Sequence, residues 1–111
     1  MRARVQRAGV VSLMMTMAAG TAQAQDAELV LGRQLFLGGA QPSCTICHTL
    51  KDAGSEGAVG PVLDEIKPDA ARVAKALRDG LGSMPSFRAS LSDAQITAIA
   101  RYVAQASGAA K

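Results

Sequence analysis

The chain has 111 residues, with twelve Lys and Arg against nine Asp and Glu and a formal net charge of +3 at pH 7. This length accommodates one small domain and no second core. The charge does not favour a nucleic-acid partner, because Arg2, Arg4 and Arg7 lie at the very start and the nine basic residues that follow are balanced by nine acidic ones.

Residues 1–24 have the three parts of a secretory signal peptide. The three arginines form a positive n-region, residues 8–19 an apolar stretch, and Ala22-Gln23-Ala24 the small-residue pattern of a cleavage site. The apolar stretch is too short to cross ~30 Å of hydrocarbon as a helix, which disfavours a retained membrane anchor. The sequence therefore predicts cleavage before Gln25, a single domain over residues 25–111, and location in the periplasm without stable membrane insertion.

Cleavage would leave few side chains that can bind a metal or cofactor. Four of the five methionines lie within the predicted signal, so the mature domain keeps Met84, together with His48, Cys44 and Cys47. The chain has only two Phe, one Tyr and no Trp, which makes a thin core. Small domains of this kind usually need a metal, disulfides or a cofactor for stability.

A first helix is predicted over residues 28–37, where Leu31 and Leu35 share one face at a spacing of four. Gly38-Gly39 ends it, and a short connection leads to the cysteines. The glycine-rich segment between His48 and Pro61 predicts a loop, followed by one short turn at residues 63–66.

A second helix is expected to begin near Pro68-Asp69 and to stop at Gly80, with Val73, Ala74 and Leu77 on its buried side. The last helix is expected to begin at Ser92 and to end at Gly108. Ser92 and Gln95 have the spacing of a capping box, and apolar residues then recur at helical intervals. Since no segment alternates like a strand, the predicted fold is all-α.

Cys44-Thr45-Ile46-Cys47-His48 is the Cys-x-x-Cys-His pattern of covalent haem attachment. Two intervening residues let both sulfurs reach the vinyl groups on one edge of a porphyrin, and His48 is then directed beneath the ring, where it can bind iron. A thioredoxin-like dithiol would need a strand–helix–strand context, and a structural zinc site would need a fourth ligand. The pattern thus favours one haem c over these two alternatives.

Met84 is the candidate for the second axial ligand. A single Met in a helical protein is often core filler, but Met84 is predicted to lie in a loop and is followed by Pro85, which stiffens the backbone. A thioether opposite His is also a ligand set of cytochromes. If His48 and Met84 both bind the metal, no position on the iron stays open.

These motifs resemble those of the class I c-type cytochromes, especially short bacterial monohaem forms. The resemblance covers nearly all of residues 25–111, and the matching segments are Gly32, Phe36, Cys44 to His48, Gly60-Pro61-Val62-Leu63, Gly82-Ser83-Met84-Pro85 and Tyr102. It implies three to four helices around one haem, with the first and last helices crossing near Gly32 and Phe36 packed near Tyr102. It also implies that the Pro61 carbonyl accepts a hydrogen bond from the His48 ring. Compared with many family members, the chain is short and lacks aromatic residues that often wall the haem pocket.

The resemblance implies a single-electron carrier rather than an enzyme, monomeric by itself. A periplasmic dehydrogenase would be the donor, and a terminal oxidase or another cytochrome the acceptor. A fainter similarity to cytochromes that serve molybdenum enzymes suggests a sulfite dehydrogenase as that donor. Two alternatives stay open: a cytochrome subunit of a stable oxidoreductase complex, and a haem-based sensor or enzyme if Met84 can be displaced.

Overall fold

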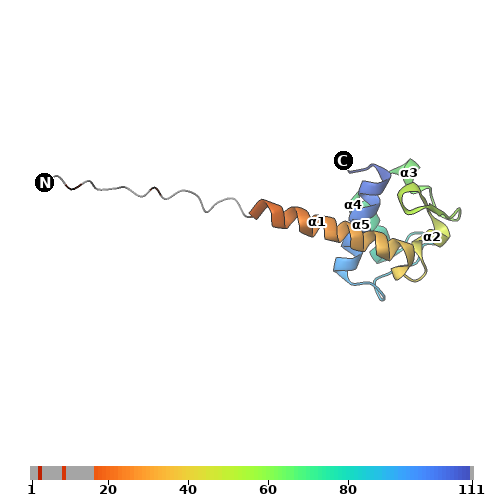
Figure 1. The fold of residues 1–111 in the computed structure, drawn as a ribbon. Helices are drawn as coiled ribbons and strands as arrows, with labels where there is room; N and C mark the ends of the chain where they lie inside the picture. The colour runs from red at the N-terminus through yellow and green to blue at the C-terminus, as the bar shows by residue number, and fades with distance from the viewer. Residues whose placement is uncertain (1–2, 4–8, 10–16, 111) are drawn as a thin grey trace.

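The computed structural model describes residues 3, 9 and 17–110 of the chain. In this part, most of the regular structure is formed by five α-helices: α1 Met17–Gln34, α2 Cys44–Cys47, α3 Leu63–Ile66, α4 Ala70–Asp79 and α5 Asp93–Ser107 (Figure 1). The all-α prediction is confirmed. The expected three to four helices are fewer than observed because α2 is a single helical turn that the sequence pattern does not distinguish from a loop.

A small hairpin follows α2. Strands β1 Thr49–Leu50 and β2 Ser55–Glu56 pair antiparallel, with Leu50 opposite Ser55. A 3-10 turn, Lys51–Ala53, joins them, and Gly54 closes the turn in the left-handed region at φ 62°. The sequence pattern predicts a loop here, because two-residue strands are too short to show alternation.

Helix α1 is longer than predicted at its amino-terminal end. It begins at Met17 rather than near Glu28, since the alanine-rich segment before Glu28 has high helix propensity. It continues into a π-helical turn, Leu35–Gly39, which ends at the predicted glycine pair. The predicted signal peptide lies partly outside the described residues, and residues 17–24 form the first turns of α1. No helix in the described part of the chain is long and apolar enough to span a membrane.

Helices α1 and α5 cross at Gly32, as the family resemblance implies. A Cβ on Gly32 would lie 2.7 Å from the Cβ of Tyr102 and would clash with the backbone of Ala98, so only glycine permits this approach. The rings of Phe36 and Tyr102 meet edge-on, with centroids 6.0 Å apart. Leu31, expected on the same face as Leu35, stays 38% exposed.

Helices α4 and α5 begin and end at the capping residues that the sequence predicts. Asp69 caps α4, because its side chain accepts a 2.8 Å hydrogen bond from the backbone N–H of Arg72. Ser92 and Gln95 form the expected capping box at the start of α5, which ends at Gly108.

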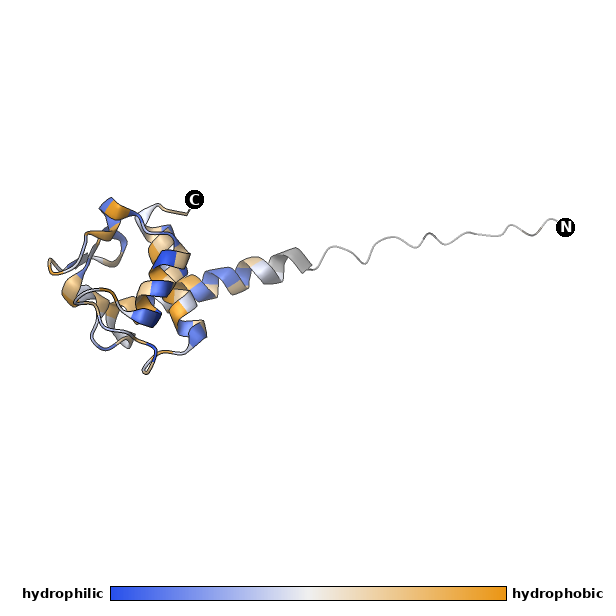
Figure 2. Cartoon of the chain, turned by 180° about the vertical axis from the view of Figure 1, so that it is seen from behind, coloured by the Kyte–Doolittle hydropathy of each residue, from blue (hydrophilic) through white to orange (hydrophobic). Residues whose placement is uncertain are grey.

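The core lies where α1, α4 and α5 meet. Hydrophobic residues recur in the helices that surround it (Figure 2), and its largest fully buried side chains are Phe36, Leu50, Leu77, Ile96, Ile99 and Val103. Helix α5 packs against both α1 and α4, and α3 also contacts it. This arrangement leaves α2, α3 and the segment after α4 around a cavity beside the core.

Candidate cofactor site

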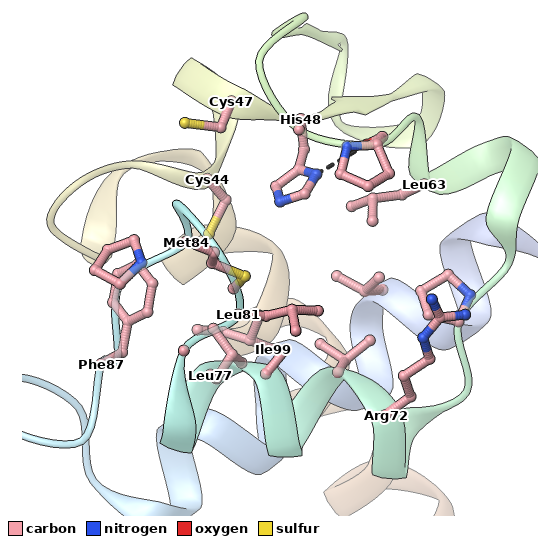
Figure 3. A pocket seen from close by; sticks show the side chains of 18 of the residues that line it. Cys44, Cys47, His48, Leu63, Arg72, Leu77, Leu81, Met84, Phe87 and Ile99 are labelled. Atoms are coloured by element: carbon pink, nitrogen blue, oxygen red, sulfur yellow. Dashed lines mark hydrogen bonds between the residues drawn. The ribbon is translucent and has the colours of Figure 1, made fainter.

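A cavity of about 650 Å³ opens between α2, α3, α4 and the loop that follows α4 (Figure 3). Its volume lies within the range of about 300–1,000 Å³ that is usual for small-molecule sites. The lining is mainly apolar, and includes Leu63, Ile66, Val73, Leu77, Ile99 and Val103. The cavity also brings together Cys44, Cys47, His48, Pro61 and Met84, the five residues that the sequence singles out.

The two cysteines lie on the single turn of α2. Ser43 begins this turn, since its side chain accepts a hydrogen bond from the backbone N–H of Thr45 and its hydroxyl lies 2.8 Å from that of Thr45. Residues three apart lie on the same side of a helix, so the turn holds Cys44 and Cys47 at one wall of the cavity. Both are free, half-buried thiols.

Burial raises the pKa of the Cys44 thiol to about 11. That pKa already includes the lowering effect of a backbone hydrogen bond and a smaller upward contribution from the nearby Cys47. Cys44 is therefore protonated at neutral pH, unlike the low-pKa thiolates of dithiol oxidoreductases. The strand–helix–strand context of such enzymes is also missing from the described residues, where β1 and β2 form a hairpin.

The ring of His48 is oriented by a backbone carbonyl. His48 Nδ1 lies 2.9 Å from the carbonyl oxygen of Pro61, which is the hydrogen bond that the resemblance implies. Because a carbonyl can only accept, Nδ1 carries the proton, and Nε2 of the neutral ring keeps its lone pair. In Figure 3 the ring points into the cavity, so Nε2 is available to a metal there.

Two glycines let the chain pass close to this histidine. A Cβ on Gly60 would lie 2.7 Å from Cε1 of the His48 ring, and a Cβ on Gly57 would lie 2.6 Å from the His48 backbone nitrogen. Contacts this short are essentially forbidden to real side chains. The loop after β2 can therefore fold back over His48 only because glycine occupies both positions.

The backbone of His48 is held as firmly as its ring. Its N–H donates to the carbonyl of Cys44 at 3.0 Å, and its own carbonyl accepts from the Gly57 N–H at 3.2 Å and from the Ser55 hydroxyl at 2.5 Å. Ser55 is buried, with 5% of its surface exposed. Sequence reasoning missed Ser55, because a serine in a polar loop carries no signal of its own.

Met84 reaches the cavity from a tight loop after α4. Leu81 and Met84 exchange two backbone hydrogen bonds, of 3.0 and 2.9 Å, around Gly82, whose φ of 57° is left-handed. The Met84 side chain is half-buried and points into the cavity in Figure 3. The prediction that Met84 lies in a loop and not on a helix is confirmed.

Charged residues occur only at the α4 side of the lining. They are Arg72, Lys75 and Asp79, of which Lys75 and Asp79 pair at 2.9 Å. Phe36 and Phe87 also line the cavity, so it has aromatic walls despite the low aromatic content of the chain.

These side chains fit a covalently attached haem. The cavity is apolar and large, two thiols lie on one wall, and an imidazole with a free nitrogen and a thioether reach into the same space. This set is typical of a haem held by two thioether bonds with His and Met as axial ligands.

Two comparisons relate this chain to known proteins. A family model described as cytochrome C oxidase, cbb3-type, subunit III matches residues 32–103, the segment that contains all five candidate residues. Among solved structures, the c-type cytochrome SorU from Sinorhizobium meliloti is similar, with a TM-score of 0.72 and 48% sequence identity. That match covers 75% of this chain and 94% of the SorU chain. No curated protein matches the chain.

Proposed function

The chain belongs to the class I c-type cytochromes, electron-transfer proteins that carry one covalently bound haem c, and on this premise we propose that it shuttles single electrons in the periplasm between a dehydrogenase and a respiratory acceptor. The observation that carries the proposal is the placement of Cys44, Cys47, His48 and Met84 around one apolar cavity. Bound haem supplies an iron centre that takes up and releases one electron at a time.

In this proposal the residues of the chain have distinct tasks. The thiols of Cys44 and Cys47 would hold the haem through thioether bonds, and His48 Nε2 and the Met84 sulfur would bind its iron. The Pro61 carbonyl keeps the proton on His48 Nδ1 and thereby fixes which nitrogen faces the metal. The apolar lining excludes water, so little rearranges when the charge at the site changes by one unit.

An optical spectrum of the purified holoprotein tests this assignment. The oxidised and reduced states should show the bands of a c-type haem, and the oxidised state should also show the weak near-infrared band of a methionine–iron bond. Haem bands without the near-infrared band would support the assignment as a cytochrome but contradict Met84 as a ligand. They would favour a sensor or enzyme with an open position on the iron. A protein without any haem would contradict the proposal as a whole.

Export is the second part of the proposal. It is supported by the arginines, the apolar stretch and the Ala22-Gln23-Ala24 pattern in residues 1–24. Mass spectrometry of the periplasmic protein should find a chain that begins at Gln25 and carries one haem. A chain that keeps residues 1–24 would instead indicate a retained amino-terminal segment.

The identity of the donor is the third part. The sequence resemblance favours a molybdenum sulfite dehydrogenase, with a terminal oxidase or a further cytochrome as acceptor. Mixing the oxidised protein with such a dehydrogenase and sulfite should reduce the haem at a rate that depends on both proteins. Co-elution of the two would identify a subunit of a stable complex, whereas rapid reduction without co-elution would identify a free carrier.

A further inference from the structure

The carboxyl end of α4 is completed by residues that follow Met84. An α-helix leaves its last four carbonyls without partners inside the helix. In α4, the carbonyl of Leu77 accepts a 2.7 Å hydrogen bond from the N–H of Phe87, and the carbonyl of Arg78 accepts one from the hydroxyl of Ser86. Two residues directly after Met84-Pro85 thus serve as the cap of this helix.

Ser86 joins the end of α4 to the segment that follows Met84 through one oxygen. Its hydroxyl donates to the Arg78 carbonyl, and the same oxygen accepts a 3.2 Å hydrogen bond from the backbone N–H of Arg88. The Ser86 hydroxyl therefore links the end of α4 to the backbone of the segment that returns from the cavity. A substitution that removes this hydroxyl leaves a carbonyl of α4 without its protein partner.

The loop that carries Met84 is attached on both sides of that residue. Before Met84, the paired hydrogen bonds with Leu81 close the tight turn. The segment also packs against Gly80, where a Cβ would lie 2.8 Å from the Met84 carbonyl oxygen and 3.1 Å from the Ser86 nitrogen. After Met84, two side chains fasten the returning segment to α4 by hydrogen bonds: Ser86 bonds to the Arg78 carbonyl inside the helix end, and Arg88 bonds to the exposed Asp79 carboxylate at 3.3 Å.

A thioether cannot be oriented in the way that an imidazole can. Its sulfur has no hydrogen to donate and accepts only weakly, so a Met ligand lies where its backbone places it. Met84 depends on its loop for this, and the loop depends on the end of α4.

We infer that Ser86 is the positioning residue for Met84: by capping α4 it keeps the Met84 loop closed and so resists displacement of the thioether from the metal. This inference rests on the proposed role of Met84 as axial ligand. It makes the carboxyl end of α4 part of the site, because release of Met84 and release of the helix cap occur together.

Displacement of Met84 by imidazole measures the effect. Oxidised holoprotein is titrated with imidazole while the near-infrared band is followed, for wild type and for Ser86→Ala. Because a net hydrogen bond corresponds to roughly a 3- to 10-fold change in an equilibrium, Ser86→Ala should bind imidazole about 3- to 10-fold more tightly. Ser86→Thr, which keeps the hydroxyl, should bind it like wild type.

Ser90→Ala is the matched control. Ser90 lies in the same exposed segment, and its hydroxyl donates to the nearby Phe87 carbonyl at 3.4 Å instead of to α4. Equal imidazole affinity in wild type and Ser86→Ala would overturn the inference, and so would an equal gain in Ser86→Ala and Ser90→Ala. If the wild type itself lacks the near-infrared band, the proposed role of Met84 fails first, and the two failures are thereby distinguished.

Hydrogen exchange of the wild-type holoprotein gives an independent test that needs no variant. Saturation with imidazole should speed exchange of the Phe87 N–H, which bonds to α4, by the same displacement that removes the near-infrared band. The N–H of Gly57, which bonds to the His48 carbonyl, should not change. Unchanged exchange at Phe87 after the band has gone would show that the helix cap and Met84 are not coupled, and would also overturn the inference.

Discussion

The two walls of the cavity hold their proposed ligands by different means. On the wall that carries His48, the ring is hydrogen-bonded to Pro61 and the backbone carbonyl to Ser55 and Gly57. On the wall that carries Met84, the side chain packs against the apolar core, makes no hydrogen bond within the described residues and is placed by the backbone of its loop. The difference follows from chemistry, since an imidazole offers an N–H to a fixed acceptor and a thioether does not. The Met84 wall is therefore the one expected to open.

The largest effect should come from the cysteines of the His48 wall. Cys44→Ala or Cys47→Ala removes one of the two sulfurs that attach the cofactor, so normal attachment by two thioether bonds should be lost. The intact mass of the exported protein and the position of the reduced haem bands check this. A variant that still carried haem through two thioether bonds would show that the attachment lies elsewhere.

Met84→Ala should keep the haem but change its electronics. Loss of the soft thioether opens a position on the iron and should lower the reduction potential by a sizeable part of the ~0.8 V range that haem axial ligands span. Redox titration with optical detection measures the change, together with loss of the near-infrared band. If both stayed as in wild type, Met84 would be a core residue, and the contrast between the two walls would lose its meaning.

Gly60→Ala should disturb the His48 ring directly. The added methyl group would lie 2.7 Å from the ring Cε1 and 2.9 Å from Nδ1, so the loop or the ring must shift, at a cost of about 1–3 kcal/mol of folding stability. Denaturant unfolding of the holoprotein measures this loss. Gly38→Ala is the control, because its methyl group would meet nothing within 4 Å. Similar losses in the two variants would mean that Gly60 is not needed for the close approach.

Ser55→Ala should weaken the His48 wall without affecting the Met84 wall. It removes the hydroxyl from the His48 carbonyl, which keeps its bond to Gly57, and should reduce unfolding stability by about 0.5–1.5 kcal/mol. Imidazole affinity should stay at the wild-type value, because the Ser55 hydroxyl donates to the carbonyls of Thr45 and His48 and not to the Met84 loop. An increase in imidazole affinity like that expected for Ser86→Ala would show that the walls respond as one unit.

The smallest effect should be a pH dependence of folding stability that arises from Asp79, at the end of α4 beside the Met84 loop. The hydrogen bond and charge of Lys75, and then Arg88, lower the pKa of Asp79 below its ordinary value of 3.8. The ionised carboxylate therefore adds stability above the ordinary pKa, and this contribution is lost as the pH falls through the lowered value. Asp79→Asn should lose stability at neutral pH and approach wild type in acid, as unfolding curves at several pH values will show.

Because the Asp79 side chain is 47% exposed, salt should screen this contribution. Repeating the curves in ~1 M salt, where the screening length falls to about 3 Å, should bring wild type and Asp79→Asn together at neutral pH. A difference that persisted in high salt would indicate that Asp79 acts on the loop by packing instead of by charge.

Several features were predictable from the sequence because they depend on residues close together in the chain. The spacing of Cys44, Cys47 and His48, the cap at Ser92 and the helix stop at Gly80 are local patterns, and the structure has all of them. The start of α1 lies earlier than the predicted one, since periodicity reports a buried face, whereas residues 20–27 of α1 are exposed and rich in alanine.

The hydrogen-bond partners could not be predicted in this way. Ser55 and Ser86 look alike in sequence, yet one is buried against His48 and the other is exposed at the end of α4. Tyr102 was expected to pack on Phe36, but its hydroxyl also donates to Asp52 at 2.6 Å, fifty positions away in the chain. Such pairs arise only when packing brings distant backbone segments together.

By itself, the sequence determined the cofactor chemistry, the order of the helices and which side chains are candidates to hold a metal. Those properties follow from residue type and from short spacings along the chain, which do not depend on how distant segments pack. The tertiary structure alone decided how each candidate is held. His48 is hydrogen-bonded to the loop that folds over it, whereas Met84 lies on a loop that is hydrogen-bonded to the end of α4. That distinction is tertiary because a hydrogen bond depends on position and direction in space, and packing sets both.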